Sequence, residues 1–448
     1  MKIIIVGAGT IGSNLAKFLS EENHEVYLIE QNDETARLVT GKLDVKVVVG
    51  NGTDPDILEK VQIQQTDLVL AVTTSDETNL VVCSLAASLG AKRRIARVRN
   101  TSLSRVLGEF GYKHFNIDEI INPELVAAHS VVKTIEAPGT KEVADFANGR
   151  LLLRAFELTK TSPLYGLKIA DLRDEDFPWP FVIISIIRKG SVIIPQGETT
   201  LQENDLIYVL LPAYSLGEFL TFVNPEIRKT QKVIIYGATI IGEYAALGLT
   251  KSVRDIILLE ENEERANEVA GRLTSVRVIH GSPSDGTILT ECGIEATDVF
   301  VAASMNDHAN LVTSVLAKKR GAKITMITSH QPDYLSIVDA LDINVVINPH
   351  FLAVDQILQL VRGRGIRSVT KLLECHCEAL EFVPESGSPV TKAPLKDIKF
   401  PKNCIVGAVY SGEEINLAKG DTHVREGEKV IVFCQEPAVK KLQELFTR

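Results

Sequence analysis

The sequence has little of what marks a secreted, disulfide-stabilised or membrane-spanning protein. Its 448 residues include only six cysteines, and these are scattered, which suits a reducing cytoplasm better than a disulfide framework. The longest apolar runs are interrupted within about ten residues, whereas a membrane helix needs roughly 20. The first apolar run leads into a glycine turn and not into a cleavage site, so no signal peptide is expected. We therefore expect a soluble, cytoplasmic protein.

The chain also lacks an excess of basic residues. It has 48 Lys and Arg against 58 Asp and Glu, a formal net charge of −10. Nucleic-acid binding depends on cationic contacts with phosphates, and a polybasic membrane anchor needs clustered Lys and Arg. The charge balance argues against both classes of protein.

What the sequence does contain is a duplication. Residues 2–12, KIIIVGAGTIG, return as residues 232–242, KVIIYGATIIG. In both copies the next apolar run ends in an acid at the same offset, Glu30 and Glu260. A chain of this length exceeds what one hydrophobic core supports, so several domains are expected.

Each copy begins with short β-rich runs that alternate with helical stretches. This alternation predicts βαβ units, and hence a parallel sheet covered on both faces. The runs are 2–6, 25–29, 45–49, 68–72, 94–98 and a weak one at 115–117, then 233–236, 255–259, 276–279, 299–302, 323–327 and 344–347. We predict an α/β fold with two Rossmann-like, doubly wound domains.

A β-rich segment follows each of these domains. Strand-like runs at 151–158, 181–187, 192–194 and 205–211 include a hairpin turn at 188–191, and residues 197–209 resemble residues 420–432. Each half therefore adds a small α+β domain to its sheet domain. We predict domains at 1–123, 140–224, 231–349 and 366–448, with linkers at 137–149, 212–231 and 363–369.

The turn Gly7-Ala8-Gly9-Thr10-Ile11-Gly12 follows a predicted strand and opens a helix. Gly7 permits the tight turn, Gly9 lets a pyrophosphate approach the backbone, and Gly12 lets the helix pack closely on the strand. A phosphate would then lie at the helix N-terminus. Glu30 is placed to accept hydrogen bonds from ribose hydroxyls and would repel a 2′-phosphate. The motif predicts an adenine dinucleotide, with NAD(H) favoured over NADP(H).

Other polar residues follow the strands of the same sheet and belong at the same crevice. Asn51 and Thr53 follow the third strand, Thr73 and Thr74 follow the fourth, and Arg97 and Arg99 flank the end of the fifth. We expect them to contact the ligand; the alternative is that they are turn formers and solvated arginines.

The second copy departs from the motif at Thr239, which replaces the middle glycine. Gly237, Ile241, Gly242 and Glu260 remain, so either an adenosine moiety binds there with displaced phosphates, or the cleft is empty and structural. His308 is expected to be a surface histidine near this second cleft. The sequence Cys375-His376-Cys377 lacks further ligands, so no metal site is predicted.

A dehydrogenase would need acid/base residues in a second domain. The β-rich segments contain no His–Asp or Lys–Tyr pair suited to that task, so we expect a regulatory ligand and not an enzyme. An NAD-dependent oxidoreductase and a ligand-free scaffold are the alternatives. The nearly apolar stretch 79–87 is expected to be buried in its domain or in an interface. We also place a hinge at Asn122-Pro123.

In the order of its domains the chain resembles the TrkA family, the cytoplasmic nucleotide-binding components of bacterial Trk potassium-uptake systems. The resemblance covers the whole length and is carried by the Gly7–Gly12 turn, Glu30, residues 50–54, residues 96–100 and Asn122-Pro123-Glu124. It implies RCK-type domains (regulator of potassium conductance) that bind NAD(H) or ATP/ADP. It also implies a homotetrameric ring, attached peripherally to the membrane through a TrkH/TrkG-like potassium channel subunit whose gate it controls.

Overall fold

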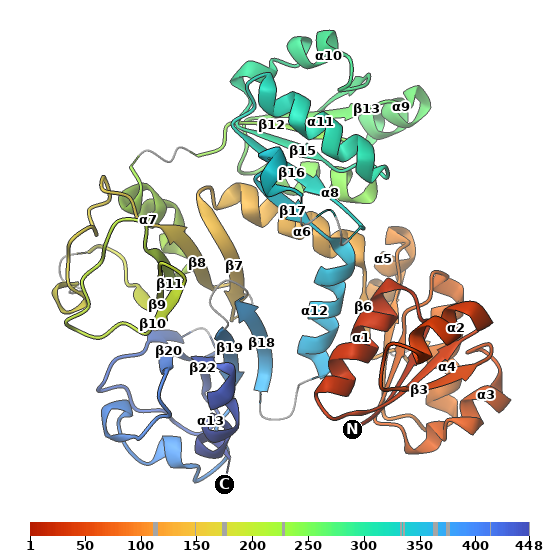
Figure 1. Cartoon of the computed structure of the whole chain (residues 1–448), viewed down its shortest axis with the longest axis horizontal. Helices are drawn as coiled ribbons and strands as arrows, with labels where there is room; N and C mark the ends of the chain where they lie inside the picture. Colours follow the sequence, from red (N-terminus) through yellow and green to blue (C-terminus); the bar gives the residue numbers. More distant parts are fainter. Residues whose placement is uncertain are drawn as a thin grey trace. The chain divides into compact units, whose positions relative to one another are not determined.

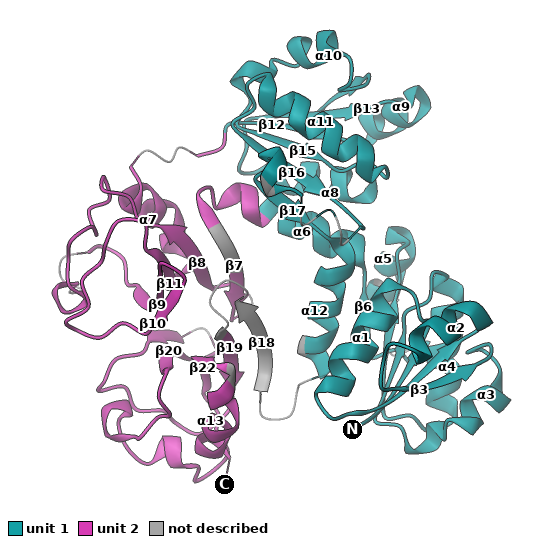
Figure 2. Cartoon of the chain, viewed as in Figure 1, with its two compact units in different colours: residues 1–132, 231–361 teal, residues 133–230, 362–448 magenta. Residues whose placement is uncertain are grey.

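The computed structural model describes residues 1–110, 115–147, 149–172, 177–225, 229–331, 334, 337–361, 366–372, 377–412 and 414–447. The chain forms two compact units, each built from one piece of each half (Figure 2). The first unit comprises residues 1–132 and 231–361, and the second comprises residues 133–230 and 362–448. Among the described residues, no helix combines the length and the apolar character needed to cross a bilayer.

The first unit holds two six-stranded parallel sheets, in the orders β3-β2-β1-β4-β5-β6 and β14-β13-β12-β15-β16-β17 (Figure 1). The first half supplies β1 (Lys2–Val6), β2 (Glu25–Glu30), β3 (Lys46–Val49), β4 (Leu68–Ala71), β5 (Arg93–Arg97), β6 (Glu119–Ile121), α1 (Thr10–Glu21), α2 (Asp33–Thr40), α3 (Pro55–Lys60), α4 (Asp76–Ser88), α5 (Thr101–Phe110) and α6 (Pro123–Glu136). The second half supplies β12 (Lys232–Tyr236), β13 (Asp255–Glu260), β14 (Arg277–His280), β15 (Val299–Ala302), β16 (Ile324–Thr328), β17 (Val345–Ile347), α8 (Ile240–Leu249), α9 (Glu263–Arg272), α10 (Gly286–Glu291), α11 (Asp307–Lys319) and α12 (Pro349–Val361).

The predicted doubly wound fold is confirmed in both halves. The central strand β1 is buried along its whole length, as expected for a strand of a parallel sheet that helices cover on both faces. One strand prediction was wrong, because the sixth strand is Glu119–Ile121 and not 115–117. Asn116 has a φ of 55°, a left-handed conformation that does not fit a strand.

Each α/β domain packs its last helix, α6 or α12, against the other α/β domain. Residues Ala353, Val354, Ile357, Leu358 and Val361 of α12 share one hydrophobic core with Leu15 and Leu19 of α1. In return, a Cβ built on Gly248 of α8 would come within 2.8 Å of Val132 Cγ2 in α6. This exchange of helices joins the two α/β domains into one unit.

The second unit holds two five-stranded sheets, in the orders β10-β9-β11-β8-β7 and β18-β19-β22-β20-β21, and their described strand pairs are antiparallel. The first consists of β7 (Thr140–Phe146), β8 (Leu151–Glu157), β9 (Val182–Arg188), β10 (Ser191–Ile193) and β11 (Leu206–Pro212), followed by α7 (Leu216–Val223). The other consists of β18 (Ile366–Leu372), β19 (Cys377–Phe382), β20 (Cys404–Ser411), β21 (Glu414–Leu417) and β22 (Lys429–Gln435), followed by α13 (Val439–Phe446). The predicted α+β modules and the hairpin at 188–191 are confirmed.

These two modules share an apolar core that both sheets line. Phe146 and Phe433 meet edge to face with ring centroids 6.2 Å apart. The linker predictions were wrong, because 137–149 contains β7, 212–231 contains α7, and 363–369 overlaps β18. In α7, Phe219, Leu220 and Val223 are buried, so this segment is part of the module core and not a tether.

Candidate functional site

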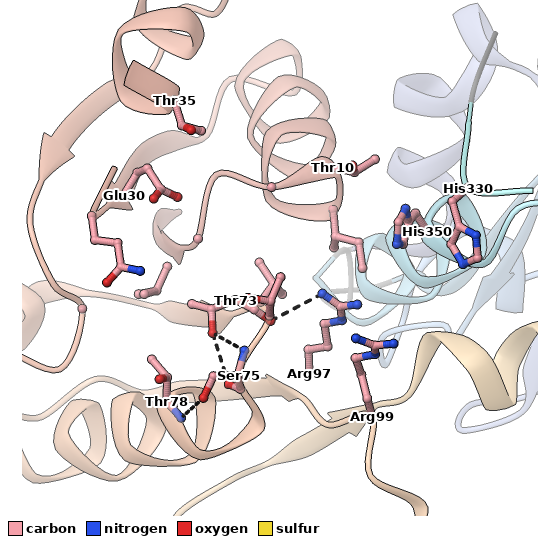
Figure 3. Close-up of a pocket in the computed structure, with 18 of the residues that line it drawn as sticks. Thr10, Glu30, Thr35, Thr73, Ser75, Thr78, Arg97, Arg99, His330 and His350 are labelled. Carbon is pink, nitrogen blue, oxygen red and sulfur yellow. Dashed lines mark hydrogen bonds between the residues drawn. The ribbon is translucent and has the colours of Figure 1, made fainter. Parts of the chain in front are cut away.

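A pocket of about 970 Å³ opens at the carboxyl ends of the first parallel sheet (Figure 3). This is the edge where ligands of doubly wound sheets bind. It is lined by the predicted residues Gly7, Gly9, Thr10, Ile11, Glu30, Asn51, Thr73, Thr74 and Arg97. Residues from five different strand ends thus come together as the sequence predicted.

The three glycines of the turn have different physical roles. Gly7 has a φ of +104°, a conformation that side chains other than glycine rarely adopt. A Cβ on Gly12 would lie 1.8 Å from the Gly7 carbonyl oxygen, so this glycine allows α1 to pack on the turn. A Cβ on Gly9 would meet nothing within 4 Å. The backbone of the turn therefore requires glycine at positions 7 and 12, whereas the absence of a side chain at Gly9 leaves space in the pocket.

Gly9 is also the N-cap of α1. Among the described residues no side chain caps this helix end, so its first N–H groups remain available to an anion. Beside it, Glu30 is fixed by two backbone N–H groups, from Ala8 to Oε2 at 2.7 Å and from Asn32 to Oε1 at 2.8 Å. A carboxylate has about four acceptor positions, so further hydrogen bonds to hydroxyl groups fit its chemistry.

Three of the predicted residues support the pocket without lining it. Thr53 donates both its N–H and its hydroxyl to Asn51 Oδ1, at 3.0 and 2.9 Å, and so forms a turn under the pocket wall. Ala8 donates its N–H to Glu30, and Gly12, in the first turn of α1, packs against the Gly7 carbonyl. These three do not line the pocket.

A buried asparagine holds the strand ends in place. The amide of Asn79 donates to the carbonyls of Thr73 and Arg97, at 3.2 and 2.9 Å, and its Oδ1 accepts from the Thr73 N–H at 2.9 Å. The ends of β4 and β5 are therefore tied together. Because the Thr73 hydroxyl also donates to Asn79 Oδ1, at 2.7 Å, it is partly committed to the structure.

The end of the pocket opposite Glu30 is cationic (Figure 3). Arg97 is only 7% exposed and donates to the Thr73 carbonyl at 3.4 Å. Burial lowers the pKa of this guanidinium below its ordinary value, and the neighbouring Glu124 opposes that effect. Arg99 pairs with Glu124 at 2.8 Å.

The second half of the chain supplies the remaining wall. Its contributions are Met305, Asn306, Asp307, His308, His330, Gln331, Tyr334 and His350. His308 is exposed, as expected of a surface histidine, and it also lines this first pocket, where its Nε2 lies 2.7 Å from the Tyr334 hydroxyl. No local pattern in the sequence predicts these residues, since only the joined halves bring them to the cleft.

In the equivalent cleft of the second half, a side chain of the protein itself caps the helix start. The hydroxyl of Thr239 accepts from the Gly242 N–H at 3.2 Å and donates to the Ala303 carbonyl at 2.8 Å. The N-terminus of α8 is therefore capped. Glu260 accepts from the Ala238 N–H at 2.7 Å, as Glu30 does from Ala8. Ile241 is buried beneath the helix start.

Charges in this second cleft also differ from those in the first. Glu243 stands in the first turn of α8, at the position of Ser13 in α1, and forms ion pairs with Arg265 and Arg272. Arg265 occupies the position of Thr35 and donates through Nε to the Ala238 carbonyl at 3.1 Å. Burial raises the pKa of Glu243, and the two arginines oppose this. A carboxylate in the first turn of a helix disfavours a second anion at the same N-terminus.

No group of three or more His, Cys, Asp or Glu side chains suited to a metal ion occurs among the described residues. Residues 375 and 376 of the Cys-His-Cys sequence lie outside them.

Family models match most of the chain, twice each. The TrkA-N domain matches residues 3–123 and 233–349, and the TrkA-C domain matches residues 153–223 and 379–447. Full-length relatives include Trk system potassium uptake protein TrkA homolog 2 of Methanosarcina mazei, 32% identical over 100% of both chains. The TrkA protein of Azorhizobium caulinodans is 30% identical over 100% of this chain and 98% of its own.

Solved structures share the fold. The GsuK channel bound to NAD superposes with a TM-score of 0.63 at 18% identity, covering 99% of this chain and 78% of that chain. The GsuK RCK domain gives a TM-score of 0.62 at 19% identity, covering 99% of this chain and 94% of that chain.

The glycine geometry predicts opposite effects on stability at two neighbouring positions. Gly12→Ala should lower the free energy of unfolding by roughly 1–3 kcal/mol or more, because its Cβ would overlap the Gly7 carbonyl. Gly9→Thr should change it by only a few tenths, since Thr239 occupies the equivalent N-cap with nearly the same backbone angles, φ −77° and ψ 174°. Urea unfolding of both variants tests this; equal destabilisation would contradict the assigned roles.

Proposed function

We propose, from the premise that this chain belongs to the TrkA family of potassium-uptake proteins, that it is the nucleotide-binding regulatory subunit of such a system. Its ligand is an adenine nucleotide, NAD(H) or ATP/ADP, and its output is control of a membrane-embedded potassium channel subunit of the TrkH/TrkG type. In this proposal the protein is cytoplasmic, forms a homotetramer, and attaches to the membrane through that partner.

The observation that carries the proposal is the uncapped N-terminus of α1 beside a fixed carboxylate. A pyrophosphate suits the free N–H groups at Gly9, and the ribose of its adenosine suits Glu30 at the end of β2. The pocket volume of about 970 Å³ accommodates a ligand of this size. Support also comes from GsuK, whose solved structures include one bound to NAD and one bound to ADP.

The proposed output is mechanical. A ligand shifts a conformational equilibrium only through its different affinity for the two states, and nucleotides that share an adenosine but differ beyond it meet Arg97 differently. Asn122 joins this end of the pocket to α6, because it donates to the Arg99 carbonyl at 3.0 Å and accepts from the Leu125 N–H at 3.0 Å. Through Asn122-Pro123 a change at the pocket reaches α6, which continues into the second unit.

Removing the carboxylate should alter both affinity and selectivity. Glu30→Ala should weaken NADH binding about tenfold or more and reduce the discrimination against NADPH, because a charged acceptor of ribose hydroxyls is lost. Glu260→Ala is the matched control, since Glu260 accepts the two equivalent backbone N–H groups, those of Ala238 and Asn262, in the second cleft. Calorimetric titration of both variants tests this; equal binding of NADH and NADPH by the unmodified chain would refute the role of Glu30.

The second cleft should remain empty. Calorimetry should give one nucleotide per chain, because Thr239, Glu243 and Arg265 already satisfy the groups that a phosphate would bind. Restoring the first-half residues in the triple variant Thr239→Gly, Glu243→Ser, Arg265→Thr should create a second site. Two bound nucleotides per unmodified chain would disprove this assignment. The single variant Gly9→Thr should bind no nucleotide.

Potassium flux should depend on the nucleotide. With the chain and its channel partner reconstituted in vesicles, flux should differ between NADH, NAD, ATP, ADP and no nucleotide, and Arg97→Ala should flatten the difference. Gly9→Thr serves as the reference that binds no nucleotide. Measured NADH consumption should be nil, whereas turnover would favour an oxidoreductase. Identical flux under every condition would contradict nucleotide control and support the alternative of a scaffold that only stabilises the channel.

A further inference from the structure

The cationic end of the pocket is completed by histidines that the nucleotide motif does not include. His330 follows β16 and His350 lies in α12, so both come from the second half, and both face Arg97 and Arg99 of the first half (Figure 3). The two imidazole rings lie 5.2 Å apart in an edge-to-face arrangement. The pocket thus has an adenosine-side carboxylate at one end and two arginines with two histidines at the other.

Each histidine has a distinct environment. His330 is oriented by Asp307 of α11, which accepts from the His330 backbone N–H at 2.8 Å and lies 3.2 Å from its Nδ1. The Nδ1 of His350 is buried and has no hydrogen-bond partner among the described residues. A buried nitrogen without a partner is costly, so a rotation of the imidazole ring that lets a ligand supply one is favoured.

The surrounding charges leave room for an anion. Arg99 is paired with Glu124, and Asp76 accepts from the backbone N–H groups of Arg99 and Asn100. Arg97 makes its hydrogen bond to a neutral carbonyl, that of Thr73, and its buried Nε has no partner among the described residues. His308, also on this wall, is engaged with Tyr334.

We propose that Arg97, His330 and His350 form a subsite for the terminal phosphate of an adenine nucleotide, and that proton binding to the histidines controls its affinity. The inference rests on the proposed nucleotide site and assigns it a specificity element from the second half of the chain. Dinucleotides lack a terminal phosphate, so this subsite discriminates nucleoside di- and triphosphates from NAD(H).

The direction of the pH effect follows from the geometry. Burial, together with His330, Arg97 and Arg99, lowers the pKa of His350 to about 4, and Asp307 opposes this. A phosphate at the subsite reverses the balance, because a dianion stabilises the imidazolium and accepts its additional N–H. Phosphate binding therefore takes up protons, and by linkage the affinity for ATP rises as pH falls. The affinity for NADH lacks this term.

The experiment is a calorimetric titration of the full-length chain with ATP and with NADH between about pH 6 and pH 8. The ratio of ATP affinity to NADH affinity should rise about fivefold or more toward the acidic end. His330→Gln with His350→Gln should remove most of that rise. The exposed His423→Gln, in the second unit, is the control that should leave it unchanged. Because ATP protonates identically with every variant, the difference between variants isolates the histidines.

A second measurement does not depend on the variants folding. Titrating the unmodified chain in buffers of different ionisation enthalpy counts the protons taken up, which should be greater for ATP than for NADH by more than free ATP accounts for. An unchanged ratio across pH, or an equal rise in the double variant, would overturn this subsite while leaving the nucleotide site intact. If inorganic phosphate bound at Arg97 in protein already saturated with ATP, the terminal phosphate of ATP could not be occupying that position, and this result would also overturn the subsite. Absence of any nucleotide binding would instead refute the proposed function itself.

Discussion

The open N-terminus of α1 is the constraint on which the rest of the site depends. Parallel strands place their carboxyl ends at one edge, and β1 lies at the centre of the sheet, so the turn after it faces every other strand end. Gly12 lets the helix start press on that turn, and Gly9 leaves the first N–H groups exposed. This uncapped helix end is the centre of the pocket, and the residues at the other strand ends surround it: Glu30, Asn51, Thr73 and Arg97.

The second half keeps the same architecture, but its helix start is capped from within the protein. Unpaired N–H groups at a helix N-terminus need partners, and Thr239 supplies one from inside the protein. Glu243 then brings a carboxylate to the helix dipole, and Arg265 and Arg272 balance its charge. Internal side chains thus provide a hydrogen-bond acceptor and a negative charge at this helix start, where an anion would otherwise do so.

The fold and the motif-based part of the pocket could be predicted from the sequence because both depend on local patterns. Alternating apolar runs identify a parallel sheet, and the spacing from Gly7 to Glu30 identifies its binding edge. Features that depend on tertiary contacts could not be predicted in this way. The Leu216–Val223 helix lies in the predicted linker 212–231 although its apolar residues recur at helical spacing, and no local pattern predicts that His330 and His350 line the pocket. Those histidines reach the pocket only because the halves are joined through α6 and α12.

The exchange of helices has a consequence for coupling. Since α12 is part of the core around α1, and His350 stands near its first turn, the position of the second α/β domain is linked to the wall of the first pocket. A ligand that contacts both walls favours the spacing that suits it, and by reciprocity that spacing changes the ligand's affinity. A site with all its residues in one domain would not report on that spacing. The two halves therefore contribute differently to the first pocket: one presents an uncapped helix end, and the other presents the opposite wall.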